Sequence, residues 1–353
     1  MKLSIDQKTL SAALKQVARV AAVRSTLPTI QGIFLDASFE HGLKLRATNL
    51  TIMETITLEA EVEEEGKTVA PRMLVDLVET MKGDLQLELS KLQLSVNAGK
   101  SKSRLNCYDP EDFPQVASPD KWLQVSVRDF LAGIARTLFS VNETEYLATS
   151  GVQVELDGNF MNFHSTDSLG RISMAKFPLV SEVASYILPK DSCKELLKVL
   201  QGEVAEVAFG PTLSVRCGNV ELSTQVMEDK FPDVSRMVQA EFALVATSFK
   251  EDWLDALRQV SVLGSSFITL TFSGNSLSFR SVSQELGNSE AEIEVENTGK
   301  DATINLNPKY LKDAIDAVPT SKFHFKQSPS TFVTIAPLEG DSCLFLIAPM
   351  NVK

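Results

Sequence analysis

The chain has 353 residues, of which 44% are hydrophobic and 23% are charged, the composition of a folded globular protein. This composition excludes a disordered, collagen-like or coiled-coil chain, the apolar stretches are too short for a membrane-spanning helix, and the polar first residues do not resemble a signal peptide. The net charge of −12 argues against general attraction to nucleic acid or anionic lipid, although basic side chains could still gather on one surface.

Amphipathic patterns predict six helices, in chain order over residues 6–20, 70–82, 127–137, 189–201, 249–260 and 307–318. Alternating apolar and polar residues after a glycine predict strands over residues 43–49, 161–167 and 277–283. These landmarks recur about every 120 residues, which indicates internal repeats. We therefore expect three copies of one α+β unit with two helices and antiparallel sheets, in domains over residues 1–119, 120–241 and 242–353.

The side chains that carry most enzyme chemistry are sparse. The four cysteines are far apart in sequence, which favours buried free thiols in a reducing cytoplasm over disulfides or a zinc site. The three histidines are isolated, and no nucleophile elbow, zinc-protease helix or dinucleotide-binding loop is present. We therefore expect no cofactor, no metal site and no catalytic activity.

Charge is unevenly distributed along the chain. The predicted helices are net positive and the rest is strongly negative, a segregation that suits a basic surface facing phosphates but also occurs on ordinary solvated helices. Two predicted strands carry charges at alternate positions: bases at Lys100, Lys102 and Arg104, and acids at Glu290, Glu292, Glu294 and Glu296. Such charges could merely protect sheet edges from unwanted pairing, or they could join the first and last repeats of two chains head to tail.

Five segments carry a resemblance to a known family. They are TLPTIQGIFLDA (26–37), LKLRATNLTIMETI (43–56), HSTDSLGRISMA (164–175), DKFPDVSRMV (229–238) and the closing LIAPMNVK. In these segments the chain resembles the bacterial DNA polymerase III β subunit, the sliding clamp. The resemblance implies three sliding-clamp domains per chain and a homodimeric ring that encircles duplex DNA and tethers the replicative polymerase.

The resemblance also implies three sets of site residues. The bases and the tyrosine expected to face DNA are Arg24, Lys15, Arg19, Arg136, Tyr146 and Lys198. The partner-peptide pocket, expected to take short Leu- and Phe-containing peptides of DNA polymerase and clamp-loader subunits, comprises Thr166, Leu169, Gly170, Arg171, Ile172, Pro232, Met237, Ile347, Ala348, Pro349 and Met350. One further wall position is either Leu147 or Thr149. The dimer interface is expected to contain Lys100, Lys102, Arg104, Leu105, Glu290, Glu292, Glu294 and Glu296.

This sequence departs from the family pattern at two places in the expected pocket. The loop from Thr166 to Ile172 is one residue longer than usual, and Ala348 stands where a larger methionine is typical. The resemblance therefore implies a pocket of altered shape. An alternative function is a non-catalytic three-repeat scaffold that binds proteins without encircling DNA, and retention on circular but not linear DNA would separate the two.

Overall fold

The computed structural model describes residues 1–116, 119–144, 147–238, 241–328, 332–340 and 342–351. The chain divides into two compact units, one formed by residues 1–127 and 194–226 and the other by residues 128–193 and 227–353. Among the described residues, no helix is long and apolar enough to cross a membrane.

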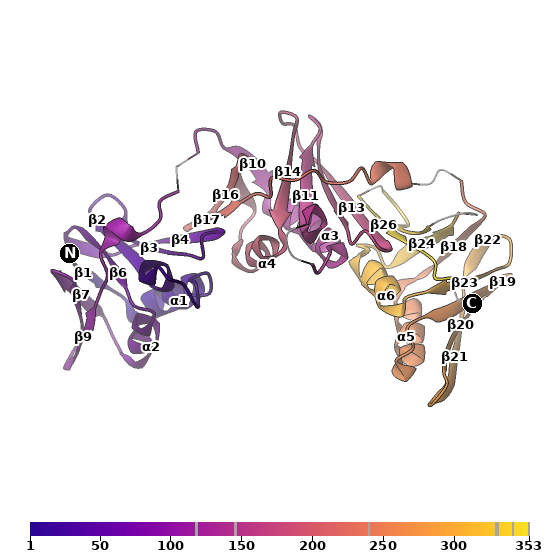
Figure 1. Cartoon of the computed structure of the whole chain (residues 1–353), viewed down its shortest axis with the longest axis horizontal. Helices are drawn as coiled ribbons and strands as arrows, with labels where there is room; N and C mark the ends of the chain where they lie inside the picture. The colour runs from indigo at the N-terminus through magenta and orange to yellow at the C-terminus, as the bar shows by residue number, and fades with distance from the viewer. Residues whose placement is uncertain (117–118, 145–146, 239–240, 329–331, 341, 352–353) are drawn as a thin grey trace. The chain divides into compact units, whose positions relative to one another are not determined.

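The first unit contains two sheets and two complete helices (Figure 1). One sheet has the strand order β5-β1-β7-β8-β9 and the other the order β10-β15-β16-β17-β4-β3-β2-β6. Its helices are α1 (Gln7–Val17) and α2 (Met73–Thr80), and its strands are β1 (Lys2–Ile5), β2 (Ile33–Ser38), β3 (Gly42–Thr48), β4 (Ile52–Leu58), β5 (Glu61–Glu64), β6 (Gly66–Ala70), β7 (Leu85–Ser90), β8 (Gln93–Ala98), β9 (Ser101–Asn106), β10 (Leu123–Ser126), β15 (Val204–Ala208), β16 (Thr212–Cys217) and β17 (Val220–Gln225).

The second unit also contains two sheets, of order β14-β11-β12-β13-β26-β25-β24-β18-β22 and β21-β20-β19-β23. Two more helices, α3 (Val127–Thr137) and α4 (Lys190–Val199), cross the boundary between the two units, and α5 (Lys250–Val260) and α6 (Pro308–Ala317) lie within the second unit. Its strands are β11 (Gly151–Leu156), β12 (Phe160–Thr166), β13 (Arg171–Pro178), β14 (Ala184–Pro189), β18 (Leu244–Phe249), β19 (Ile268–Ser273), β20 (Ser276–Ser283), β21 (Gly287–Glu294), β22 (Glu296–Gly299), β23 (Ala302–Leu306), β24 (Lys322–Gln327), β25 (Val333–Pro337) and β26 (Cys343–Ile347).

The six predicted helices are all present, and local sequence explains where they begin. The Asp6 carboxylate caps α1 by accepting a 2.8 Å hydrogen bond from the backbone N–H of Thr9. Asn307 caps α6 in the same way, with Pro308 in the first turn. Buried side chains one turn apart then hold each helix to its sheet, as Trp253 and Leu257 do in α5. α1 packs beside α2 and α5 beside α6 (Figure 1).

All sheets are antiparallel, and two strand pairs join neighbouring repeats. β4 pairs with β17, and β13 pairs with β26, so the central repeat contributes strands to the large sheet of each unit. This sharing explains why a chain with three repeats divides into two compact units. The boundaries expected near residues 119 and 241 stay predictions. The four cysteines are buried free thiols, as their spacing predicted.

Candidate functional site

The loop between β12 and β13 is closed by its own side chains. Thr166 Oγ1 donates to the carbonyl of Arg171 (2.8 Å) and accepts from the backbone N–H of Ser168 (3.1 Å). Oδ1 of Asp167 accepts three backbone N–H groups, those of Leu169, Gly170 and Arg171, at 2.9 to 3.0 Å. The loop is therefore held in one conformation by hydrogen bonds that do not require a ligand.

Arg171 fixes this loop to the rest of the second unit. Its Nε donates to Asp167 Oδ2 (2.7 Å), its Nη1 donates to the carbonyl of Phe139 (2.8 Å), and its guanidinium lies 4.3 Å from the ring centroid of Tyr310. Burial alone would raise the pKa of Asp167, but the backbone N–H groups and Arg171 outweigh it and hold the pKa below its usual value. Because Arg171 is buried with these partners, the structure assigns it to bracing the loop rather than to an open peptide contact.

The C-terminal segment lies against the same loop. β13 and β26 pair so that Arg171 stands opposite Ile347, and the N–H of Ala348 donates to the carbonyl of Gly170 (2.9 Å). The N–H of Met350 donates to the carbonyl of Asn305 (2.8 Å). These bonds bring the loop before β13 and the segment after β26 together at one end of this strand pair.

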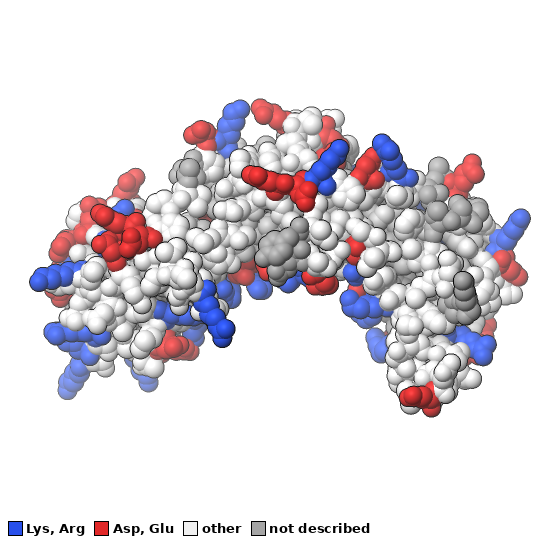
Figure 2. Space-filling model, in the orientation of Figure 1, with Lys and Arg blue, Asp and Glu red and all other residues white. Residues whose placement is uncertain are grey.

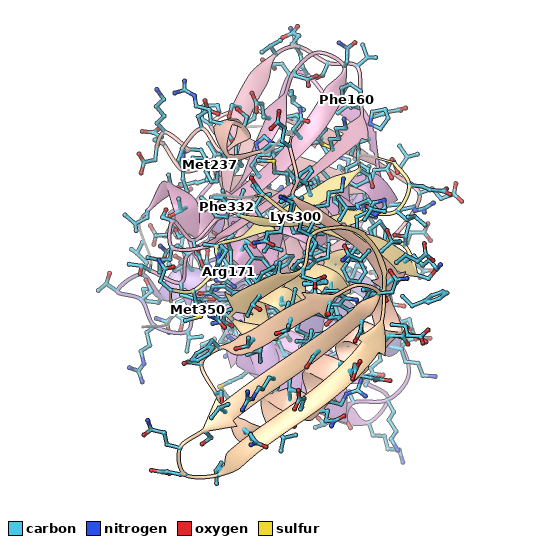
Figure 3. The ribbon with its side chains drawn as sticks, turned by 90° about the vertical axis from the view of Figure 1, so that its right-hand side faces the viewer. Phe160, Arg171, Met237, Lys300, Phe332 and Met350 are labelled. Atoms are coloured by element: carbon cyan, nitrogen blue, oxygen red, sulfur yellow. The ribbon has the colours of Figure 1, made fainter. Side chains whose placement is uncertain are left out.

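The predicted pocket residues divide into a buried floor and an exposed rim. The floor contains Thr166, Arg171, Ile172 and Ile347, whereas Gly170 and Ala348 are half-buried and Leu169, Pro232, Met237, Pro349 and Met350 are exposed. Leu169 is 83% exposed, Met237 43% and Met350 36%. Figure 3 shows Met237, Phe332, Arg171 and Met350 along one side of the second unit, away from Phe160. Exposed apolar side chains over a buried apolar cluster are typical of a protein-binding surface.

The structure also adds residues that the sequence did not indicate. Ile172 packs in a cluster with Phe231, Val234 and Leu346, and Phe332 packs against that cluster. Of the two alternatives for the further wall position, Leu147 is 46% exposed and Thr149 only 7%, so only Leu147 offers substantial surface to a ligand. Tyr310, Phe139 and Phe332 carry no local signal in the sequence because their role depends on contacts between distant segments.

The bases expected to face DNA differ in how they are held. In the first unit, Arg19 and Lys198 both pair with Glu195, at 3.0 and 3.3 Å, and Lys15 pairs with Glu79. Arg24 is exposed in the loop after α1. On the face drawn in Figure 2, many Lys and Arg side chains of the first unit gather over the part that contains the helices and β9.

An interior acid lies behind this basic group. Glu54 on β4 is fully buried and accepts a 2.6 Å hydrogen bond from Gln16 of α1. Burial raises the pKa of Glu54, and the nearby Glu195 adds to the rise. Glu195, which is itself largely buried, is the carboxylate that pairs with Arg19 and Lys198.

Arg136 is more enclosed than a freely exposed base, and its contact with DNA stays a prediction. Its guanidinium lies 5.3 Å from the ring centroid of Phe177, and its Nη1 is buried. The side chain is half-buried because it lies toward the sheet that α3 covers rather than on the free face of that helix. Tyr146 lies outside the described residues.

The two charged strands lie at sheet edges, as predicted, but both patterns are shorter than expected. β9 is the last strand of its sheet and carries Lys102 and Arg104, with Leu105 partly buried against the core, whereas Lys100 lies in the turn before it. β21 is the edge of the four-stranded sheet and carries Glu290, Glu292 and Glu294. Glu296 belongs instead to β22 of the other sheet and pairs with Lys322, because the buried Val295 separates the two strands.

The described residues contain no group of three or more His, Cys, Asp or Glu side chains that could hold a metal ion. His164 lies 3.7 Å from Glu155, but burial lowers the pKa of His164 to about 4, so the ring is neutral near pH 7 and the contact is not an ion pair there. Nothing in this geometry suggests proton transfer or a nucleophile.

Comparison with known proteins gives matches along the whole chain. Three models of the DNA polymerase III beta subunit match in order: its N-terminal domain over residues 1–117, its central domain over 124–233 and its C-terminal domain over 236–351. A beta sliding clamp of Staphylococcus aureus is 26% identical over an alignment of 377 residues that covers 99% of both chains.

Solved structures agree with these matches in fold. The DNA polymerase sliding clamp of Bacillus subtilis superimposes with a TM-score of 0.95 at 19% sequence identity, and the DNA polymerase III subunit beta of Pseudomonas aeruginosa with 0.94 at 21%. Both comparisons cover 100% of each chain. The repeated architecture is therefore that of these proteins, with most side chains changed.

Proposed function

The chain belongs to the family of bacterial DNA polymerase III beta subunits, and from that premise we propose which of its surfaces meet DNA, partner proteins and a second copy of the chain. The protein is a DNA sliding clamp, a non-catalytic processivity factor that encircles duplex DNA and tethers the replicative polymerase to it. A clamp acts by topology and needs no reactive side chain. The three-repeat scaffold that never encircles DNA is not favoured.

The partner site of this proposal is the surface around the loop from Thr166 to Ile172. The observation that carries it is an exposed Leu169 on a loop that Asp167 and Arg171 hold rigid. A preformed site loses less conformational entropy on binding than a mobile one. Leu169, Met237 and Met350 then offer apolar contact to a short peptide with a leucine followed closely by a phenylalanine, from a polymerase or a clamp-loader subunit.

Duplex DNA, in this proposal, meets bases of the first unit through its phosphates. Arg24 is exposed and suits a direct contact, whereas Lys15, Arg19 and Lys198 must exchange a carboxylate partner for a phosphate. Such contacts carry no sequence information, which a sliding protein requires. Binding of open DNA should therefore be weak, independent of sequence and strongly dependent on salt.

Assembly into a cytoplasmic homodimer would use the two edge strands. β9 of one chain presents Lys102 and Arg104, and β21 of the other presents Glu290, Glu292 and Glu294. Antiparallel edges expose backbone donors and acceptors that a second strand can pair with, and opposite charges favour this pairing over self-pairing. Exposed ion pairs each contribute only about 0 to 1 kcal/mol, so apolar residues such as Leu105 must supply much of the stability.

The decisive experiment loads the protein onto nicked circular DNA with its clamp loader and measures retention by gel filtration. We expect retention on circular DNA and release after the circle is cut at one site. One variant then tests the partner surface separately from the encirclement of DNA. Leu169→Asp should be retained normally but fail to stimulate the polymerase. A wild-type protein that leaves circular and linear DNA equally fast would contradict the assignment.

A further inference from the structure

The first unit contains a second loop built like the one in the partner pocket. Thr48 Oγ1 donates to the carbonyl of Ile52 (2.8 Å) and accepts from the N–H of Leu50 (3.0 Å). Oδ1 of Asn49 accepts the N–H groups of Thr51 and Ile52, at 3.0 and 2.8 Å. Thr48 thus makes the same two kinds of hydrogen bond as Thr166, and Asn49 accepts two of the backbone N–H groups of its loop where Asp167 accepts three.

The strands around this loop also repeat those of the partner pocket. β4 follows the loop and pairs with β17, as β13 follows its loop and pairs with β26. Met53 stands opposite Thr48 across the hairpin, as Ile172 stands opposite Thr166. By this register, Ser223 occupies the position of Leu346 and Thr224 that of Ile347.

The buried floor is repeated as well. Met53, Val69 and Phe113 form a buried cluster with Phe34, and the corresponding residues of the partner pocket are Ile172, Ile187 and Phe231. Each phenylalanine is followed by a proline, Pro114 or Pro232. Above the first cluster lies a cavity of about 450 Å³, whose wall includes Leu50, Met53, Pro114, Val116, Thr212 and Ser223.

Leu50 is the unusual residue of this cavity. Its φ is 76°, in the left-handed region, and its side chain is 50% exposed. A left-handed conformation costs a non-glycine residue roughly 1 to 2 kcal/mol, so an exposed leucine here is unfavourable both for the backbone and for solvation. Folding alone gives no reason for this residue, whereas display of an apolar side chain at the mouth of a cavity does.

The cavity adjoins a second depression of the surface, called the shelf here, which is lined in part by basic side chains. The shelf shares Met53, Gln115, Val116 and Ser223 with the cavity and adds Lys44, Arg46 and Arg216. Arg216 is paired with Glu206 and Glu221, and Glu59 is the other acid of the shelf. Among the described residues, Arg46 hydrogen-bonds the neutral Gln115 and lies over Phe34, and neither Arg46 nor Lys44 forms an ion pair, so both charges can attract a carboxylate although the bases and acids named here balance overall.

We propose that this cavity, with Leu50 at its mouth, is a second peptide-binding site, and that its occupant is an extended partner segment with one apolar residue followed by acidic residues. The apolar side chain would enter beside Leu50 and Val116, and the carboxylates would lie over Lys44 and Arg46. Thr212 and Ser223 stand where the partner pocket has Phe332 and Leu346, so the wall of this site is more polar and offers less apolar contact to the bound side chain. It is separate from the partner pocket, and its test does not depend on the outcome there.

The binding test uses the full-length protein and fluorescein-labelled nine-residue peptides in which one Leu, Ile, Val or Met precedes three Asp. Fluorescence anisotropy should find at least one peptide that binds with a Kd below about 1 mM, the weak end of specific recognition. Lys44→Glu should weaken that peptide about tenfold or more, because it replaces an attraction by a repulsion. Leu169→Asp, the matched change in the partner pocket, should leave its affinity unchanged and weaken only the Leu and Phe peptide.

Leu50→Gly guards against misfolding as the cause of lost binding. Glycine accepts a positive φ, so this variant should be as stable as the wild type or more so, and it should still stimulate the polymerase. The acidic peptide should nevertheless bind it several-fold more weakly. Undiminished binding to both Leu50→Gly and Lys44→Glu would overturn the proposal, as would the absence of binding by every peptide at 1 mM.

A photo-reactive leucine in the peptide gives a readout independent of the variants. Cross-links should form within residues 48–53 and 113–116, and mass spectrometry of a tryptic digest can place them. Cross-links confined to residues 166–172 would mean that the acidic peptide uses the partner pocket and would refute a second site.

Discussion

Arg171→Ala tests whether the partner loop is held by the contacts described above. The change removes a charge-assisted hydrogen bond to Asp167, a hydrogen bond to the carbonyl of Phe139 and the stacking on Tyr310. Hydrogen bonds of charged groups contribute roughly 1.5 to 3 kcal/mol each, and a cation over an aromatic ring about 0.5 to 2 kcal/mol. Asp167 keeps three backbone donors, so its charge is not left unpaired. These interactions share one side chain and are not additive, so we expect a loss below their sum, about 2 to 4 kcal/mol in the local stability of the loop.

Hydrogen exchange measures this loss where it occurs. A free-energy change of about 2 to 4 kcal/mol corresponds to exchange that is about 30- to 1,000-fold faster for amides that open with the loop, those of Leu169, Gly170 and Arg171. Leu169→Ala is the matched control, because Leu169 is 83% exposed and its removal should leave exchange nearly unchanged. That control should nevertheless weaken the Leu and Phe peptide by about 10- to 100-fold, the effect of losing about 1.5 to 3 kcal/mol of apolar burial.

The two variants thus distinguish a residue that holds the loop in place, Arg171, from a residue that touches the peptide, Leu169. Arg171→Ala with unchanged exchange would show that the hydrogen bonds of Thr166 and Asp167 hold the loop without Arg171. Leu169→Ala with unchanged affinity would show that the exposed leucine does not touch the peptide.

The pH dependence of the stability of the loop gives a further check on the role of Asp167. Because the folded pKa of Asp167 is depressed, its contribution should be complete above the unfolded value of about 3.9, decrease as pH falls below that value, and be lost once pH has fallen through the lower folded pKa.

Four further predictions follow from other parts of the chain. Changing Lys100, Lys102 and Arg104 to Glu should give monomers at micromolar concentration by sedimentation, and an intact dimer would contradict the role given to the edge charges. The free energy of unfolding should fall by up to about 3 kcal/mol between pH 6.5 and pH 4, because the folded pKa of His164 is about 4 and the unfolded chain takes up the proton at higher pH. In a plot of the free energy of unfolding against pH, His164→Gln should flatten this part of the curve. The affinity for open duplex DNA should fall steeply between 50 and 200 mM salt without sequence preference, and a pronounced preference would exclude a purely phosphate-based contact. Ala348 and the longer loop predict a reshaped pocket, so a peptide selected for a typical bacterial clamp should bind more weakly here, and equal affinity in a fluorescence titration would refute the reshaping.

The helices could be predicted from sequence because their signals are local. Asp6, Asn307 and Pro308 mark helix starts, and apolar pairs such as Trp253 and Leu257 mark the buried faces. The repeat then predicts that each copy reuses the same order of elements. These features depend on residues a few positions apart, which is the range over which capping and helical spacing operate.

The parts that could not be predicted depend on distant segments or on the exact end of a strand. Arg171 meets Tyr310 only after β13 and β26 have paired and α6 has packed nearby. Glu296 continues the alternation of β21 in sequence, but the buried Val295 turns the chain into another sheet. Arg136 has the composition of a surface base, yet its position on α3 directs it to Phe177. In each case the pattern is correct locally and the packing decides the outcome.

The loop from Thr48 to Ile52 shows the same limit of sequence-based prediction, because here the structure is repeated although the sequence differs. Its backbone and floor repeat the partner pocket, but the sequence shows little of this, because Thr48 and Ile52 are four residues apart whereas Thr166 and Arg171 are five apart. The hydrogen bonds and the strand register identify Ile52 and Arg171 as equivalent despite this difference. Once the pairs are matched, the side chains can be compared position by position, and Ser223 in place of Leu346 predicts a more polar site. A repeat can thus preserve the geometry of a binding loop while substitutions at the wall change which peptide it accepts.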